Sequence, residues 1–261
     1  MKEDSSPYQD QHDAIRAEFA RQAESWGRDR IDADLLWVVD RLGLRPGFVV
    51  LDVAAGTGLL GRAIAPRVKE VIAVDITPEM LAHGRQEADR EGIGNIRFEE
   101  GAAEDLRYPS ASFDMVVTRF SVHHFKSPGV VIREMARVCR LQGSVAVIDI
   151  VSPEDEQLAA RYNRLERIRD PSHSRALPPG ELKGLIEASG IRISGDDFRD
   201  VPNDLTEWLD RSRTEGRSRE EILEGLRGEL TGGAPTGMRP FEAGGRLLFT
   251  HTWEVLVGVK E

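Results

Sequence analysis

The chain has 261 residues, 40% of them hydrophobic, and a formal net charge of −10. The length suits one large domain or a domain with a cap, and an acidic surface repels phosphate backbones, which disfavours a nucleic-acid substrate. With no apolar run near 18 residues, no signal-peptide core and a single cysteine, Cys139, we expect a cytoplasmic protein with no membrane span, no intramolecular disulfide and no metal site.

Two amphipathic helices are predicted before the first strand. Apolar residues recur at helical spacing over 13–26 and again over 31–42. The first stripe consists of Ile15, Phe19, Ala23 and Trp26. It has two interpretations: ordinary core packing, or a lid over a ligand bound further along the chain. On the second interpretation residues 1–43 form an N-terminal helical lid, and Trp26 is a candidate contact for the substrate.

The stretch from Val49 to Gly61 predicts a buried strand, a glycine-rich turn and the start of a helix that Pro66 ends. Its glycines, Gly56, Gly58 and Gly61, spell the dinucleotide pattern G-x-G-x-x-G, which is weak when it stands alone. Asp52 at the strand end argues against a dinucleotide, because a carboxylate beside the loop would repel a pyrophosphate. A ligand with positive charge suits the same position.

A second buried strand, Val71–Asp75, also ends in an acid. The Asp75 carboxylate can accept hydrogen bonds from both hydroxyls of a ribose, as in nucleotide-binding folds generally. Ile76 is placed to cover an adenine face. A helix is expected to follow from Pro78 to about Glu91, with Thr77 as its N-cap.

Strand and helix patterns alternate five times up to residue 151, which predicts a doubly wound parallel sheet. The later strands are expected at 96–99, 112–120 and 145–151. After 151 the pattern changes. Helical segments are expected over 154–175 and 178–190, a sixth strand that starts at 191–193, and a long final strand over 246–259. Because no further crossover helix precedes it, the final strand is predicted to insert antiparallel.

The motifs between 49 and 151 resemble those of class I S-adenosylmethionine (SAM) methyltransferases, of the type that includes the ubiquinone/menaquinone-biosynthesis C-methyltransferases. The loop D-x-A-x-G-x-G at 52–58 is similar to their first motif. The resemblance implies SAM as cofactor and a Rossmann-like, seven-stranded sheet whose last strand is antiparallel. It implies one domain, with a SAM-binding core at 44–151 and cap insertions at 152–178 and 200–245.

The resemblance also implies which residues contact the cofactor. They are Asp52, Ala54, Ala55, Gly56, Gly58, Asp75, Ile76, Ala103, Glu104 and Arg119. Many relatives carry Asp where this chain has Ala102, to hold the adenine amino group. Here that contact must come from the backbone or from Glu104, unless Glu104 is simply part of an exposed acidic turn.

Methyl transfer from a sulfonium needs a base only if the acceptor must lose a proton, as a phenol or an enol carbon does. The candidates are His123, His124 and His173, each of which also has a packing interpretation. The block from Arg169 to Arg175 resembles a segment of bacterial relatives. His173 and Arg169 are candidate acceptor contacts, or the block is an Asp-Pro-Ser turn braced by its arginines.

We therefore expect methyl transfer to a small-molecule acceptor, phenol- or quinol-like at carbon or oxygen. Two alternatives stay open: an NAD-dependent oxidoreductase, favoured by the glycine pattern, and a SAM-binding protein without turnover. The sequence also leaves a homodimer open.

Overall fold

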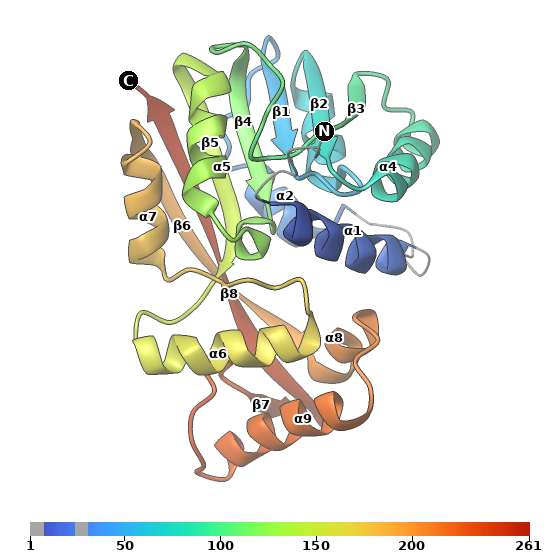
Figure 1. The fold of residues 1–261 in the computed structure, drawn as a ribbon, viewed down its shortest axis with the longest axis vertical. Coiled ribbons are helices and arrows are strands. Elements are labelled where there is room, and N and C mark those ends of the chain that lie inside the picture. Colours follow the sequence, from blue (N-terminus) through green and yellow to red (C-terminus); the bar gives the residue numbers. More distant parts are fainter. Residues whose placement is uncertain (1–7, 24–30) are drawn as a thin grey trace, which may run out of the picture.

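The computed structural model describes residues 8–23 and 31–261. Its sheet follows the order β3-β2-β1-β4-β5-β8-β6 (Figure 1). The strands β1 to β5 are parallel, and β8 runs antiparallel to both of its neighbours. Their bounds are β1 Val49–Val53, β2 Glu70–Asp75, β3 Ile96–Glu100, β4 Phe113–Arg119, β5 Cys139–Val151, β6 Ile191–Asp204 and β8 Arg246–Lys260. The predicted Rossmann-like sheet with an antiparallel last strand is confirmed. A short strand, β7 (Phe241–Ala243), pairs with β8 in addition.

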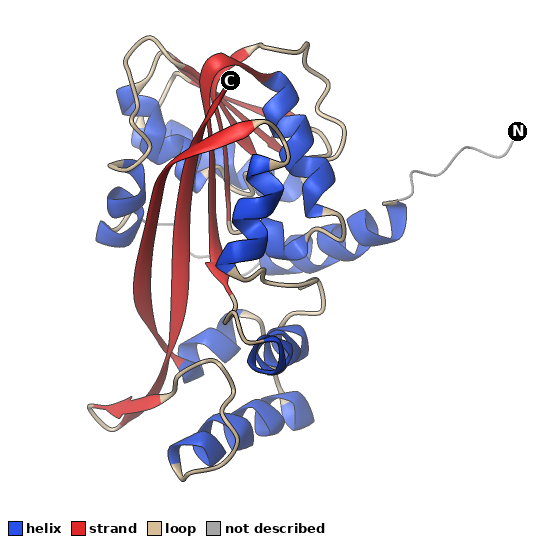
Figure 2. Cartoon of the chain, turned by 90° about the vertical axis from the view of Figure 1, so that its left-hand side faces the viewer, coloured by secondary structure: helices blue, strands red, loops and turns tan. Residues whose placement is uncertain are grey.

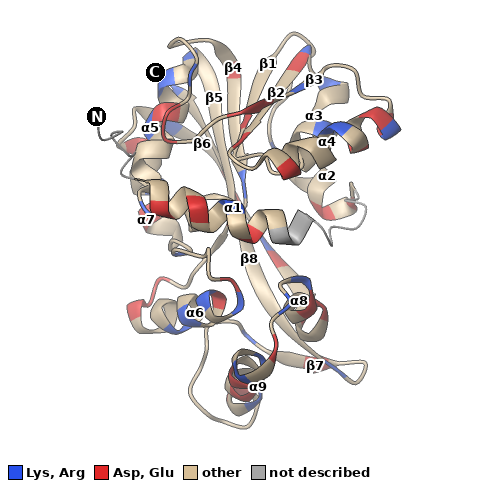
Figure 3. Ribbon diagram, turned by 45° about the vertical axis from the view of Figure 1, so that its right-hand side comes forward, with Lys and Arg blue, Asp and Glu red and all other residues tan. Residues whose placement is uncertain are grey.

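Helices cover both faces of this sheet. The helices α2 (Ala33–Val39) and α3 (Leu59–Ile64) cover one face, and α5 (Pro128–Val138) and α7 (Pro179–Glu187) cover the other. In β1, Leu51 and Val53 point into one core and Val50 into the other. Burial on both faces explains why the parallel strands are near-continuous apolar runs. The helix α4 (Pro78–Glu91) packs along β3. Figure 3 shows charged residues mainly on helices and at strand ends.

The strands β6 and β8 extend well beyond the other strands and carry a second layer (Figure 2). This layer contains α6 (Glu156–Arg169), α8 (Leu205–Arg211) and α9 (Gly216–Leu230) around a separate apolar cluster. The sixth strand begins at Ile191 as expected and continues to Asp204, into a region where the sequence showed no strand pattern. Because β6 lies at the sheet edge and alternates exposed and half-buried residues, its composition is polar, and its pairing with β8 defines it.

Two other boundaries differ from the expectation. The strand β5 begins at Cys139 instead of Val145. The first helix, α1, spans Gln9–Ala23 instead of 13–26, and Trp26 lies outside the described residues. In Figure 1, α1 crosses the carboxyl ends of the parallel strands. Among the helices of the described residues, none has the length and apolar character needed to cross a membrane.

Candidate active site

A cavity lies at the carboxyl ends of β1, β2 and β4, beneath α1. Its empty volume is about 1050 Å³ including the open mouth, which suits a ligand of nucleoside size. Of the predicted cofactor contacts, the following line it: Asp52, Ala54, Ala55, Gly56, Asp75, Ile76, Ala103, Glu104 and Arg119. Gly58 does not line it. Strand topology thus brings together residues from four separate segments of the chain.

Asp75 shapes the loop that forms the cavity floor. Its Oδ2 accepts a hydrogen bond from the Gly56 N–H at 2.7 Å, and its Oδ1 accepts one from the Thr77 N–H at 2.8 Å. Burial raises the pKa of this carboxyl above its usual value, against the lowering effect of these two bonds. Gly56 has a φ of +58°, a conformation that glycine adopts without a steric penalty.

Asp52 lies deeper and is less well bonded. Its Oδ2 accepts the Gly61 N–H at 2.9 Å, whereas its Oδ1 is buried without a hydrogen-bond partner in the described structure. Burial raises the pKa of Asp52 to about 7. A carboxyl group with an unused oxygen in a cavity wall calls for a donor or a cation from a ligand.

The roof of the cavity is α1, which is held largely by polar contacts. His12 Nε2 lies 3.0 Å from Glu104 Oε2, and Arg16 Nε donates to the Ile76 carbonyl at 2.9 Å. Phe19 meets the His124 ring edge to face, with 5.2 Å between ring centroids. Glu104 is thus bonded to α1, and its side chain is only 6% exposed, so it does not belong to an exposed turn.

A second cavity adjoins the first. Its empty volume, with the open mouth, is about 1830 Å³. Phe19, Phe120 and His124 line both cavities. The remaining walls come from the 3₁₀ turn η2 (Val122–His124), from α6 and α8, and from β8.

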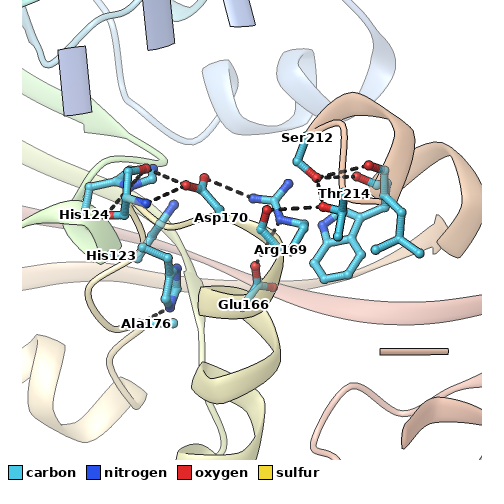
Figure 4. A network of polar contacts seen from close by, with 12 residues as sticks. His123, His124, Glu166, Arg169, Asp170, Ala176, Ser212 and Thr214 are labelled. Carbon is cyan, nitrogen blue, oxygen red and sulfur yellow. Dashed lines mark hydrogen bonds and ion pairs between the residues drawn. The ribbon is translucent and has the colours of Figure 1, made fainter. Parts of the chain in front are cut away.

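Three histidines cluster beside this second cavity: the rings of His124 and His173 both contact that of His123. Figure 4 shows His123 and His124 side by side. His123 Nδ1 lies 2.5 Å from Asp149 Oδ1 on β5. Burial alone would lower the pKa of His123, but the Asp149 carboxylate outweighs it and the pKa is raised. Burial and the neighbouring His123 lower the pKa of His124 to about 4 and that of His173 to about 3. These two imidazoles are therefore neutral at pH 7.

His173 supports the cluster from behind. Its ring stacks on His123 at a centroid distance of 5.3 Å, and its Nε2 lies 2.8 Å from Asn163 Oδ1. It is buried and lines neither of the two cavities. Arg169 does line the second cavity, with its guanidinium 4.8 Å from the Trp208 ring centroid and 3.4 Å from Asp170 Oδ2.

Comparison with known proteins identifies this arrangement. A methyltransferase-domain model matches residues 50–143. The methyltransferase YcgJ of Bacillus subtilis is 32% identical over 211 residues, covering 80% of this chain and 83% of YcgJ. Its crystal structure aligns with a TM-score of 0.78 at 29% identity, over 87% of this chain and 97% of that one. The chain belongs to the class I SAM-dependent methyltransferases.

A further relative is the ubiquinone/menaquinone-biosynthesis C-methyltransferase UbiE of Hydrogenovibrio crunogenus. It is 35% identical over 168 residues, covering 62% of this chain and 66% of UbiE. The family assignment replaces the oxidoreductase interpretation of the glycine pattern. The methyl donor of this methyltransferase is SAM.

The cavity of this methyltransferase fits SAM on its own chemistry. SAM carries an ammonium and a sulfonium and no phosphate, so it can satisfy the unpartnered Asp52 oxygen that a pyrophosphate would meet with repulsion. The shared wall at His124 leaves the second cavity open beside it. A protein that only senses SAM has no need of such an adjoining space.

Sequence reasoning missed four polar residues of the methyltransferase site: His12, Asp149, Glu166 and His251. Glu166 Oε1 lies 2.8 Å from His251 Nε2, and both residues line the second cavity together with His123. For Asp149, the sequence does contain a usable signal. Asp149 is a lone acid inside the buried run Val145–Val151, and an isolated buried carboxylate needs a partner.

Proposed function

We propose that this methyltransferase transfers the methyl group of SAM to a small-molecule acceptor held in the second cavity, a phenol- or quinol-like nucleophile at carbon or oxygen. The observation that carries the proposal is the shared wall of Phe19, Phe120 and His124. A donor in one cavity and an acceptor in the other meet at that wall.

The predicted residues would hold the cofactor as follows. Asp75 accepts the ribose hydroxyls, and Asp52 faces the ammonium. Ile76 and Ala103 cover the adenine, and Arg119 lies beside the methionine end. Bound SAM supplies an activated methyl group whose leaving group is a neutral thioether. The protein therefore mainly has to orient the acceptor and exclude water.

His123 acts as the base in this proposal. Its Nδ1 is bonded to Asp149, and its Nε2 makes no hydrogen bond to any residue that the structure describes. The Asp149 carboxylate fixes the ring and strengthens Nε2 as a proton acceptor. A phenol proton would pass to Nε2 as the oxygen or the ring carbon becomes the nucleophile. His124 and His173 stay neutral, one at the shared wall and one behind His123.

Labelled SAM, offered with a panel of phenols, quinols and amines, tests the proposal. We expect transfer to phenols or quinols, and a loss of kcat of about 10²–10⁴-fold in His123→Gln. Binding of S-adenosylhomocysteine should not change in this variant, because His123 does not line the first cavity. Transfer to amines alone would refute the acceptor class. A fully active His123→Gln would refute the base.

A further inference from the structure

One side of the second cavity is rich in arginine. Arg169 from α6, Arg211 at the end of α8 and Arg213 just after it all line the cavity. Neither Arg211 nor Arg213 makes a side-chain hydrogen bond or ion pair with any residue in 8–23 or 31–261. Two cationic groups at a cavity wall are thus available to a ligand.

Two acids of the same cavity pair with Arg169: its guanidinium lies 3.4 Å from Asp170 Oδ2 and 3.6 Å from Glu166 Oε2. Among the described residues, no acid forms an ion pair with Arg211 or Arg213. Glu166 is bonded to His251, and Asp170 accepts hydrogen bonds from the Ser172 hydroxyl at 2.6 Å and backbone at 2.9 Å. Asp210 forms an ion pair at 2.7 Å with Arg219, a residue that does not line the cavity. Only Glu207, one helical turn before Arg211, attracts its guanidinium.

The arginines also act on one another. Burial, and then repulsion from Arg169, lower the pKa of Arg211 below its usual value. Like charges brought together without an anion between them are unfavourable, and an anionic ligand relieves this repulsion. Arg213 lines the same cavity and likewise has no ion-pair partner among the described residues.

The arginine side lies away from the histidines. In Figure 4 His123 and His124 occupy one end of the polar network and Ser212 and Thr214, which follow α8, occupy the other, with Arg169 between them. Aromatic rings lie along the cavity: Phe120 meets Trp253 edge to face at 4.8 Å, and Trp208 lies beneath Arg169. An aromatic body would pack on these rings.

We propose that the acceptor is an aromatic oxyanion: a phenol- or quinol-like ring whose far end bears a carboxylate or phosphate, bound by Arg211 and Arg213. This proposal rests on the proposed function, because it assigns the second cavity to the acceptor. It adds to the proposed function that the acceptor carries an anionic group, which a neutral, purely apolar quinol lacks.

Binding without turnover gives the first test. Titrating 4-methoxybenzoate, 4-methoxyphenyl phosphate and neutral 4-methoxybenzamide into the S-adenosylhomocysteine complex compares three 4-methoxyphenyl ligands that differ in the group opposite the methoxy substituent; the benzoate and the benzamide have nearly the same shape. We expect one or both anions to bind at least tenfold more tightly than the amide. Whichever of the two anions binds more tightly shows whether the acceptor carries a carboxylate or a phosphate. Equal affinity of all three ligands would overturn the proposal.

Variants then assign the anion to its arginines. The double variant Arg211→Gln/Arg213→Gln should remove the tenfold preference and leave affinity for the amide and for S-adenosylhomocysteine unchanged. Arg217→Gln is the matched control, because Arg217 is an exposed arginine of α9 outside the cavity lining. A double variant that keeps the preference would overturn the assignment.

Turnover separates the two proposals. If 4-hydroxybenzoate and 4-hydroxybenzamide are methylated equally well, the proposed function stands and the anion proposal fails. If neither is methylated but the methoxy anions bind through Arg211, the anion site stands and the phenol class fails.

Discussion

The two buried carboxylates of the first cavity, Asp52 and Asp75, differ in their hydrogen bonds. Both oxygens of Asp75 accept backbone N–H groups, whereas Asp52 leaves one oxygen without a partner and has a pKa of about 7. Asp75 therefore shapes the loop whether or not a ligand is bound. Asp52 is the residue whose charge state a ligand can change.

We predict that binding of S-adenosylhomocysteine releases a proton near pH 7. Its ammonium beside Asp52 would favour the carboxylate and lower its pKa, so affinity should rise with pH through about 7. Calorimetry in two buffers of different ionisation enthalpy counts the protons. Asp52→Asn should release none at this site. Buffer-independent heats with the wild-type protein would mean that no cation binds beside Asp52.

Gly58 shows how a single residue can be assigned to the wrong partner. The sequence placed it against the cofactor, whereas an added Cβ would lie 2.6 Å from Phe98 Cε1, and φ is +66°. Gly58→Ala should therefore destabilise the fold through both the clash and the left-handed backbone. Gly43→Ala is the control, since its φ is +64° with nothing within 4 Å.

In thermal unfolding, Gly43→Ala should show the backbone cost alone, about 1–2 kcal/mol. Gly58→Ala should lose clearly more folding stability than Gly43→Ala. Equal losses would mean that Phe98 moves aside freely.

At the scale of elements, α1 is attached by contacts that can open separately. Gln11 Nε2 donates to the His124 carbonyl at 2.6 Å, and His12 and Arg16 bond to Glu104 and Ile76. All three partner residues line the first cavity beneath the helix, and Ile15 and Phe19 of α1 line it as well. A ligand there would add contacts to the apolar side of the helix.

We predict that S-adenosylhomocysteine slows amide hydrogen exchange across α1, because opening the helix would then also expose the ligand. Mass spectrometry of peptides from 9–23 measures this, and α9 should not respond because none of its residues lines either cavity. If the exchange rates of α1 are the same with and without the ligand, the helix is permanently packed and the lid hypothesis is refuted.

How well an element was predicted depends on what stabilises it. The central strands β1, β2 and β4 are buried on both faces, so their apolar runs are visible in the sequence. The edge strand β6 depends on backbone pairing with β8, which composition does not record. The helix α1 begins before its apolar stripe because its first turn, including Gln11 and His12, is polar and bonds to the loops below.

Whether a site residue could be predicted also depends on whether its position follows from the local sequence or from contacts between distant segments. Except for Gly58, the predicted cofactor contacts on the loops after β1 and β2 line one cavity, because strand order fixes where those loops meet. The pairing of His123 with Asp149, and of His251 with Glu166, joins residues far apart in the chain. No local pattern reports such distances.

At the scale of the whole molecule, β6 and β8 connect the layer that contains the first cavity to the layer of α6, α8 and α9. Trp253 and His251 of β8 line the second cavity, while Val255 and Leu256 lie in the two cores of the upper sheet. Between these two groups lies Glu254, which is fully buried. Its position makes the stability of the whole sheet sensitive to one ionisable group.

Burial and the nearby Asp196 raise the pKa of Glu254 to about 8, although Lys183 Nζ lies 3.8 Å from its Oε1. The folded state therefore keeps a proton that the unfolded chain, with an ordinary glutamate pKa near 4.3, has already released. Folding stability is thus lost as pH rises from about 4.5 to about 8. Neutral glutamine has nearly the same shape and cannot lose this proton.

Glu254→Gln should consequently match the wild type near pH 4.5 and exceed its free energy of unfolding by on the order of 3 kcal/mol at pH 8. Urea denaturation at both pH values measures the difference. Glu224→Gln, which changes an exposed carboxylate on α9, should unfold like the wild type at both. If Glu254→Gln gains nothing between pH 4.5 and 8, the buried carboxylate is already ionised and satisfied by Lys183, and its position imposes no cost on the sheet.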